Sequence, residues 1–313
     1  MIEDIEIFPT LEEVEKGIEA LSKNKWLQNF TVTNLNKDFE KISNEIKKHF
    51  GLIPSYKFIH QISDVSKIGS VFRAREYNKS FNINLLREYS YTPINLTKLN
   101  RCNFPQHPVL YSSENPITAL FEVLNSNNSN KIFYISKWDI IPSSSEMIIE
   151  SFLSGEINNE NYFGHINKLL RERLNEPFEN KLTTNQANGL KLYLQYLQDS
   201  FLNDNDYSIS AFLAHRSLYA PHNIKTDMIF YPSTKIPFSI NLAFHPNFVE
   251  KSMCLSRLYC VKIKDFDKKN GKIDIEYLNF GELERSHIKW IRATESDDNF
   301  KNDFNGLFIR TKI

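Results

Sequence analysis

The chain has 313 residues, of which 41% are hydrophobic, and its 38 basic and 38 acidic side chains give a formal net charge of zero. A chain of this length and hydrophobic content can bury a full core without disulfides or a structural metal. Because the net charge is zero, no overall field attracts nucleic acid or an anionic membrane, so an anionic ligand must be held by local charges. We therefore expect no direct nucleic-acid partner and no membrane partner.

The cysteines and the apolar runs predict a cytoplasmic protein. The three cysteines show no CxxC spacing, and their odd number argues against a disulfide framework. The opening residues MIEDIEIFP contain no apolar signal segment, and no run reaches the ~20 apolar residues that a membrane-spanning helix needs.

The first sixty residues carry helical patterns. Residues 10–22 are amphipathic and open with a capping box from Thr10 to Glu13. Residues 35–50 have apolar side chains at helical spacing, and Gly51 is placed to end that helix. We expect an N-terminal helical region over residues 1–62.

Strand patterns begin at Lys67. The predicted strands lie in KIGSVFRARE, HPVLYSS, NKIFYISKWDI, DMIFYPST and SINLAFHP, and residues 256–280 predict a hairpin around Asn270 and Gly271. Residues 145–220 return to a helical pattern and are interpreted as a helical insertion between strands. The prediction is an α+β fold with a mixed or antiparallel sheet, in which residues 63–313 form one domain.

The stretch YSSENPITALFEV, residues 111–123, places one carboxylate, Glu122, in an otherwise apolar helix. Asn115 and Pro116 suit the N-cap and the first helical position. Two faces of this helix are apolar, with Ile117, Leu120, Phe121 and Leu124 on one and Ala119 and Val123 on the other. We expect Glu122 in or beside a covered pocket; the alternatives are a surface residue or a structural ion pair with Arg73 or Arg101.

Common catalytic motifs are absent from the sequence. It contains no GxGxxG or Walker loop to cradle phosphates, no HExxH, and no GxSxG around any serine. We therefore expect no metal site and no serine hydrolase.

Polar residues recur beside apolar strand residues in three patches. The patches contain Arg73 and Arg75 in VFRAR, Arg101, Asn103, Tyr111 and Glu122 within residues 101–123, and Ser233 and Asn241 within residues 228–244. In order and spacing, from about residue 67 to 247, they resemble the RES domain, a family named for an Arg, a Glu and a Ser and found in NAD-degrading toxins. The chain departs from that pattern at Cys102 and His107, where the family usually has Trp and Gly.

The resemblance implies a fold like that of ADP-ribosyltransferases and NAD as substrate, with no cofactor. Water or inorganic phosphate would accept ADP-ribose, which makes the enzyme an NAD glycohydrolase (a hydrolase) or an NAD phosphorylase (a glycosyltransferase). It further implies a toxin of a toxin–antitoxin system that depletes cellular NAD, with a cognate antitoxin protein as partner. The oligomeric state is left open.

Glu122 suits this chemistry. Cleavage of the nicotinamide–ribose bond passes through an oxocarbenium-like state, and the cationic pyridinium leaves as a neutral molecule, so one fixed carboxylate suffices. Without a glycine loop, the pyrophosphate needs guanidinium groups, for which Arg101 and Arg73 are the candidates and Arg75 the fallback.

The remaining candidates are polar residues without charge. Tyr111 offers a ring to stack on nicotinamide or ribose and a hydroxyl tip. Ser233 is expected either to hydrogen-bond the ribose or to position the acceptor. By resemblance, Asn103 and Asn241 contact the substrate.

Two other functions stay open at this point. The same fold could transfer ADP-ribose to a macromolecule, and fold alone does not decide between these activities. A non-catalytic module that binds a nucleotide or a protein partner is the other alternative.

Overall fold

The computed structural model describes residues 8–23, 34–54, 57–61, 70–125, 130–141, 146–153, 168, 181–203, 207–219, 225–236, 239–267, 272–284, 287–294 and 296–304. The chain divides into two compact units, each built from three segments. The first unit contains Met1–His60, Pro93–Pro108 and Met147–Pro232, and the second contains Gln61–Thr92, Val109–Glu146 and Ser233–Ile313. The boundary expected after residue 62 lies outside the described residues.

The helices of the first unit follow the sequence prediction. They are α1 (Leu11–Ser22), α2 (Leu35–Phe50), α5 (Thr184–Asn203) and α6 (Ser208–Leu218), with the short 3₁₀ helix η5 (Ile94–Leu96). The Thr10 N–H donates to the Glu13 carboxylate at 2.8 Å, and Gly51 ends α2 with φ 74°. Both predicted helix boundaries are therefore confirmed.

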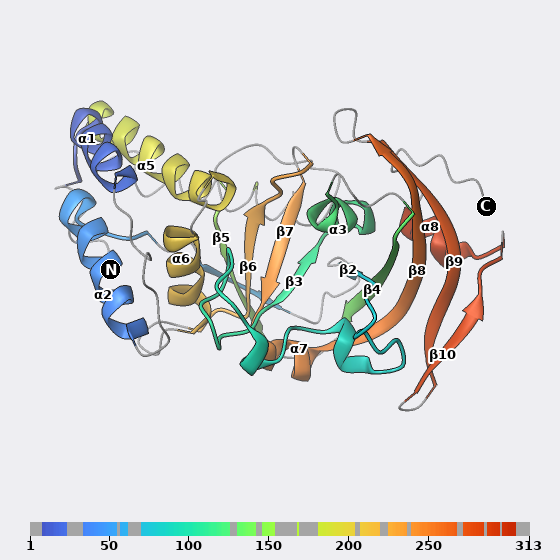
Figure 1. Ribbon diagram of the computed structural model, residues 1–313. Coiled ribbons are helices and arrows are strands. Elements are labelled where there is room, and N and C mark those ends of the chain that lie inside the picture. Colours follow the sequence, from blue (N-terminus) through green and yellow to red (C-terminus); the bar gives the residue numbers. More distant parts are fainter. Residues whose placement is uncertain are drawn as a thin grey trace. The chain divides into compact units, whose positions relative to one another are not determined.

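Helix α5 packs against the N-terminal helices (Figure 1). A Cβ added at Gly189 would lie 2.9 Å from the Pro9 carbonyl oxygen, so only glycine permits this close approach. The Phe50 and Tyr193 rings stack with centroids 4.1 Å apart, and the Tyr193 hydroxyl donates to the Leu52 carbonyl at 3.0 Å. The N-terminal region and the inserted helices thus share one core.

The strands of the first unit lie in the order β1 (Lys57–Gln61), β5 (Glu146–Ser151) and β6 (Met228–Pro232). Strands β5 and β6 are parallel, with Ile149 opposite Met228. The expectation of helix from residue 145 is therefore wrong for residues 146–151, because this segment pairs with a strand nearly eighty residues later. Apart from residue 168, residues 154–180 lie outside the described part of the chain.

The second unit contains an antiparallel sheet. Its order is β7 (Ile240–Phe244), β3 (Leu110–Ser113), β2 (Ser70–Glu76), β4 (Ile132–Ile140), β8 (Met253–Asp267), β9 (Lys272–Glu284) and β10 (His287–Arg292). The hairpin expected over residues 256–280 is confirmed by β8 and β9, the long curved strands of Figure 1, and its predicted tip lies outside the described residues.

Helix α3 (Pro116–Val123) covers one face of this sheet, together with α8 (Asp298–Phe304), while α7 (Pro246–Ser252) leads into β8. The predicted apolar face of α3 is buried with Phe72 and Ala74 of β2. Val123 is 36% exposed, so its expected place on a second buried face is wrong, since the helix ends at this residue. The short 3₁₀ helix η4 (Leu86–Tyr89) lies beside β4.

The described residues thus form an α+β protein with both parallel and antiparallel strand pairs, as predicted. All three cysteines are free. None of the described helices has the length and apolar character that crossing a bilayer requires.

Candidate active site

Glu122 is placed by the turn between β3 and α3. The Asn115 side chain accepts a hydrogen bond from the Thr118 N–H at 2.8 Å, and Pro116 follows at the first helical position, which confirms the predicted cap. Six residues of the eight-residue helix are buried, whereas Glu122 is half-buried near its end. The apolar helix therefore fixes a carboxylate at the border of the core.

Two neutral side chains hold one oxygen of this carboxylate. The Ser233 hydroxyl donates to Glu122 Oε1 at 2.6 Å, and the Asn241 Nδ2 donates to the same oxygen at 2.7 Å. The other oxygen, Oε2, accepts no hydrogen bond from any described residue. One oxygen of Glu122 thus orients the side chain, and the other is available to a ligand.

The two donors are themselves fixed. Asn241 is 1% exposed, and its Oδ1 accepts from the Ser113 hydroxyl at 2.6 Å, so its amide group faces Glu122 in only one orientation. The Ser233 oxygen accepts the N–H groups of Lys235 and Ile236 at 3.2 and 3.1 Å, which leaves its single hydrogen for the carboxylate. The site is preorganised before any ligand binds.

No cationic side chain of the described residues forms an ion pair with Glu122. Within the described part of the chain, two hydrogen bonds from neutral groups stabilise its negative charge, and its exposed side faces solvent. A carboxylate in this state can stabilise a positive charge that develops on a bound ligand, which a carboxylate already paired with Arg or Lys does less effectively.

Tyr111 lies on the same face of β3 as these residues. Tyr111 stands opposite Ala243 in the register and Ser113 stands opposite Asn241, and residues two apart on a strand point to the same side. The half-buried Tyr111 ring is therefore placed on the sheet face that carries Asn241 and Glu122.

Arg73 and Arg75 share one face of β2, as predicted, but that face is opposite to α3. In the register Arg73 lies opposite Ser136 and Arg75 opposite Tyr134, while the alternating Phe72 and Ala74 pack in the cluster that contains α3. The structure does not bring these two arginines to the face that carries Glu122.

The two arginines also differ from each other. Arg75 donates to the Glu88 carboxylate at 2.7 Å and lies over the Phe81 ring at 4.8 Å. The half-buried Arg73 guanidinium donates to no described residue, and burial, followed by the nearby charge of Arg75, lowers the pKa of Arg73 to about 10. Arg75 thus binds groups within the fold, whereas the N–H groups of the Arg73 guanidinium donate to no described residue.

Arg101 and Asn103 belong to the first unit, in the loop before β3. The Asn103 amide donates to the carbonyls of Lys98 and Phe104 at 2.7 and 2.9 Å, so its NH₂ group shapes this loop. The half-buried Arg101 guanidinium lies over the Tyr207 ring at 5.8 Å. The expected contacts of Arg101 and Asn103 with NAD stay predictions.

The sequence prediction missed a second carboxylate, Glu114, in the same β3–α3 turn. The Ser239 hydroxyl donates to Glu114 at 2.6 Å, and the Ile240 N–H donates at 3.2 Å. The Ser233 N–H donates to the Ser239 carbonyl at 2.9 Å, so Glu114 fixes the far end of the loop that begins at Ser233. The available signal was Glu114 directly before the Asn115 cap, together with a second serine ahead of β7.

Comparison with protein-family models, curated proteins and solved structures gives no match to this chain. Within the described residues, no group of three or more His, Cys, Asp and Glu side chains is arranged to hold a metal ion. Inferences about function therefore rest on the residues themselves.

Proposed function

We propose that the protein is an NAD-degrading enzyme of the RES type, with an ADP-ribosyltransferase-like fold, that cleaves the bond between nicotinamide and ribose. One observation carries the proposal. Glu122 lies more than a hundred residues before Ser233 and Asn241 in the sequence, and each of the three was assigned to the site by resemblance. They meet at a single carboxylate oxygen, with hydrogen bonds of 2.6 and 2.7 Å.

In the proposed reaction, the C1′–N bond of NAD breaks, and its electron pair goes to the pyridinium nitrogen, so nicotinamide leaves as a neutral molecule. Positive charge develops on C1′ and the ring oxygen of the ribose. The free Oε2 of Glu122 accepts a hydrogen bond from the ribose 2′-hydroxyl and stabilises this charge. Interactions of this kind contribute roughly 3 to 4 kcal/mol to lowering a barrier.

An acceptor then attacks C1′ and completes the reaction. Water loses a proton and gives ADP-ribose, whereas inorganic phosphate gives ADP-ribose 1″-phosphate. Tyr111, on the same sheet face, offers its ring to the nicotinamide or the ribose. Ser233 and Asn241 keep the Glu122 carboxylate in one rotamer, so the catalytic oxygen needs little reorganisation when the charge develops.

The test is incubation of purified protein with NAD, with and without inorganic phosphate, while nicotinamide release and the ADP-ribose product are followed by chromatography. We expect nicotinamide release, and the need for phosphate separates phosphorolysis from hydrolysis. Absence of NAD loss under both conditions would reject the proposal. ADP-ribose attached to added protein or nucleic acid, in place of free product, would instead identify a macromolecular transferase.

The toxin role and the antitoxin partner are part of the same proposal. Expression of the chain alone should lower cellular NAD and stop growth, and Glu122→Gln should restore both. Harmless expression of an active, folded wild-type protein would contradict the toxin role while leaving the chemistry intact.

A further inference from the structure

The second unit contains a cavity of about 570 Å³ that the proposed reaction does not use. Its lining comes from the loop that follows β2 and from β4: Tyr77, Lys79, Ser80, Phe81, Asn82, Ile83, Ile132 and Tyr134. Tyr134 stands opposite Arg75 in the strand register, so the cavity lies on the sheet face opposite to α3 and Glu122. It is a separate site, of the size that small-molecule pockets commonly have.

Aromatic rings form the floor and one wall of this cavity. Phe81 and Tyr134 stack with centroids 5.2 Å apart and are 4% and 8% exposed. Tyr77 packs edge-on against Phe81 yet is 41% exposed. An aromatic ring exposed beside a buried aromatic floor offers a free π face, on which a planar ring can stack.

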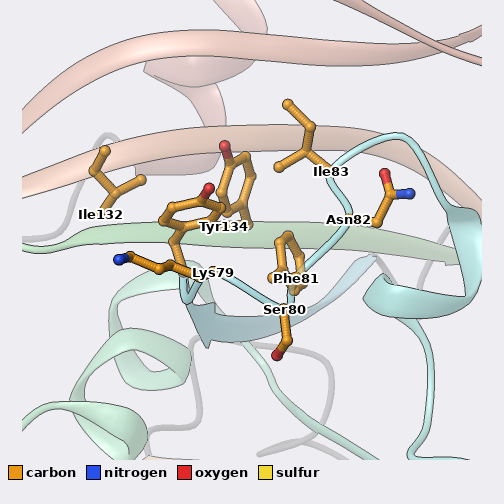
Figure 2. Close-up of a pocket in the computed structure, with 8 residues that line it drawn as sticks. Lys79, Ser80, Phe81, Asn82, Ile83, Ile132 and Tyr134 are labelled. Atoms are coloured by element: carbon orange, nitrogen blue, oxygen red, sulfur yellow. The ribbon is translucent and has the colours of Figure 1, made fainter.

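Polar groups stand at the two ends of the cavity. Figure 2 shows the Lys79 ammonium at one end and the Asn82 amide at the other, with Phe81 and Tyr134 between them. Lys79 is exposed and forms no ion pair with a described residue. The Asn82 Oδ1 accepts the Asn84 N–H at 3.1 Å, and its NH₂ group donates to no described residue.

The loop that carries these groups is ordered by its own hydrogen bonds. The Ser80 N–H donates to the Asn78 Oδ1 at 3.0 Å, and the Phe81 N–H donates to the Asn78 carbonyl at 3.0 Å. Phe81 anchors the loop in the core because it also packs edge-on against Tyr89. The cavity is therefore formed without a ligand.

We propose that this cavity binds an adenine nucleotide that carries a single terminal phosphate. The adenine base stacks on Tyr77 and pairs through its edge with Asn82, and the phosphate reaches Lys79. Lysine binds phosphate as a point charge, and one lysine suits one phosphate. Asparagine pairs with the adenine edge, since its NH₂ group donates and its oxygen accepts. An aromatic carboxylate would leave most of the cavity empty. A nucleoside triphosphate would bring further phosphate charges, for which the cavity lining offers no second cationic side chain.

The test is calorimetric titration of the full-length protein with AMP, with ribose 5-phosphate and GMP as comparison ligands. We expect saturable AMP binding with a dissociation constant below about 1 mM. Tyr77→Ala should weaken AMP binding at least about tenfold, whereas Tyr77→Phe retains the ring and the affinity. Lys79→Met should weaken it about fivefold or more at low salt, and Lys251→Ala, which removes an exposed lysine of α7, should not.

Several results would overturn the assignment. The first is no AMP binding at 10 mM, a concentration about tenfold above the expected upper limit of the dissociation constant. The others are equal affinity for AMP and ribose 5-phosphate, and equal affinity for AMP and GMP. Because AMP is also part of NAD, competition by NAD for AMP binding to the inactive Glu122→Gln protein provides the remaining control. AMP binding that NAD displaces and that Tyr77→Ala leaves unchanged would place AMP at the proposed NAD site instead. The outcome is independent of NAD cleavage, which neither Tyr77→Ala nor Lys79→Met should alter.

Discussion

Two groups of carboxylates in the second unit differ in how they are partnered. Glu122 accepts hydrogen bonds on one oxygen only, from the neutral Ser233 and Asn241. Asp297 and Asp303, beside and within α8, have charged partners instead, because Asp297 pairs with Arg257 at 2.8 Å and Asp303 with Lys137 at 2.7 Å.

The carboxylates of the two aspartates also accept hydrogen bonds from tyrosine hydroxyls, in addition to their ion pairs. The Tyr277 hydroxyl donates to Asp297, and the Tyr259 hydroxyl donates to Asp303. Their side chains are 5% and 11% exposed. A carboxylate that forms an ion pair and accepts further hydrogen bonds holds two elements of the fold together. A carboxylate with one oxygen that accepts no hydrogen bond from the protein can interact with a ligand.

The largest expected effect is that of Glu122→Gln on NAD turnover. The amide oxygen can still accept from Ser233 and Asn241, but the charge that stabilises the ribose is lost, so kcat should fall by at least about 100-fold. The free energy of unfolding should change by less than about 0.5 kcal/mol. Nicotinamide release and urea unfolding measure the two quantities. A variant that keeps wild-type kcat would remove Glu122 from the mechanism.

The reverse pattern is expected for Asp297→Asn. Of the two ion pairs of Arg257, only that with Glu282 remains, and the Glu282 side chain is 49% exposed, so a buried guanidinium loses its main charged partner and stability should drop by about 3 kcal/mol. NAD turnover per folded molecule should stay within about twofold of wild type. Asp298→Asn is the matched control, because its side chain is 88% exposed and it should cost at most about 0.5 kcal/mol.

Ser233→Ala is expected to have an intermediate effect on turnover. It removes one of the two donors to Glu122 Oε1, and a hydrogen bond to a charged group contributes about 1.5 to 3 kcal/mol, so kcat should fall at least about tenfold. Ser112→Ala serves as the control, since Ser112 points to the other face of β3 and makes one long hydrogen bond, 3.4 Å, to the Leu242 carbonyl. Equal activity of both variants would argue that Ser233 does not orient Glu122.

The smallest expected effect is an acid dependence of stability that comes from Asp297. Burial opposes ionisation of Asp297, but hydrogen bonds from Tyr277 and Arg257 outweigh it and lower the pKa of this carboxyl below its ordinary 3.8. A lowered folded-state pKa adds stability above pH ~4, which is lost as pH falls through the folded-state value. Urea unfolding of wild type should therefore lose about 1 kcal/mol more between pH 5 and 3 than Asp297→Asn does. Parallel pH profiles would contradict this.

Local sequence signals predicted most individual elements correctly. The capping box at Thr10, the glycine at 51 and the Asn115 cap each depend on side chains within a few residues, and all three occur where expected. The spacing of Arg73 and Arg75 likewise predicted that they share a face.

Long-range pairing accounts for what was missed. Strand β5 depends on its partner β6, about eighty residues later. Because the sequence that follows β5 has a helical pattern, residues 146–151 were assigned to the same helical segment. Which face of β2 meets α3 is decided by Phe72 and Ala74 in the core, so the sequence alone did not show that Arg73 points away from Glu122. The contact of Glu114 with Ser239 was missed for the same reason, because 125 residues separate them.

The most direct test of the central claim is the crystal structure of Glu122→Gln protein with NAD bound. We expect the side-chain oxygen of residue 122 to keep its contacts with Ser233 and Asn241. We also expect the other polar atom of this side chain to lie within about 3 Å of the 2′-hydroxyl of the nicotinamide ribose. NAD bound with that ribose remote from residue 122, while the Ser233 and Asn241 contacts are intact, would contradict the assignment of Glu122 as the catalytic carboxylate.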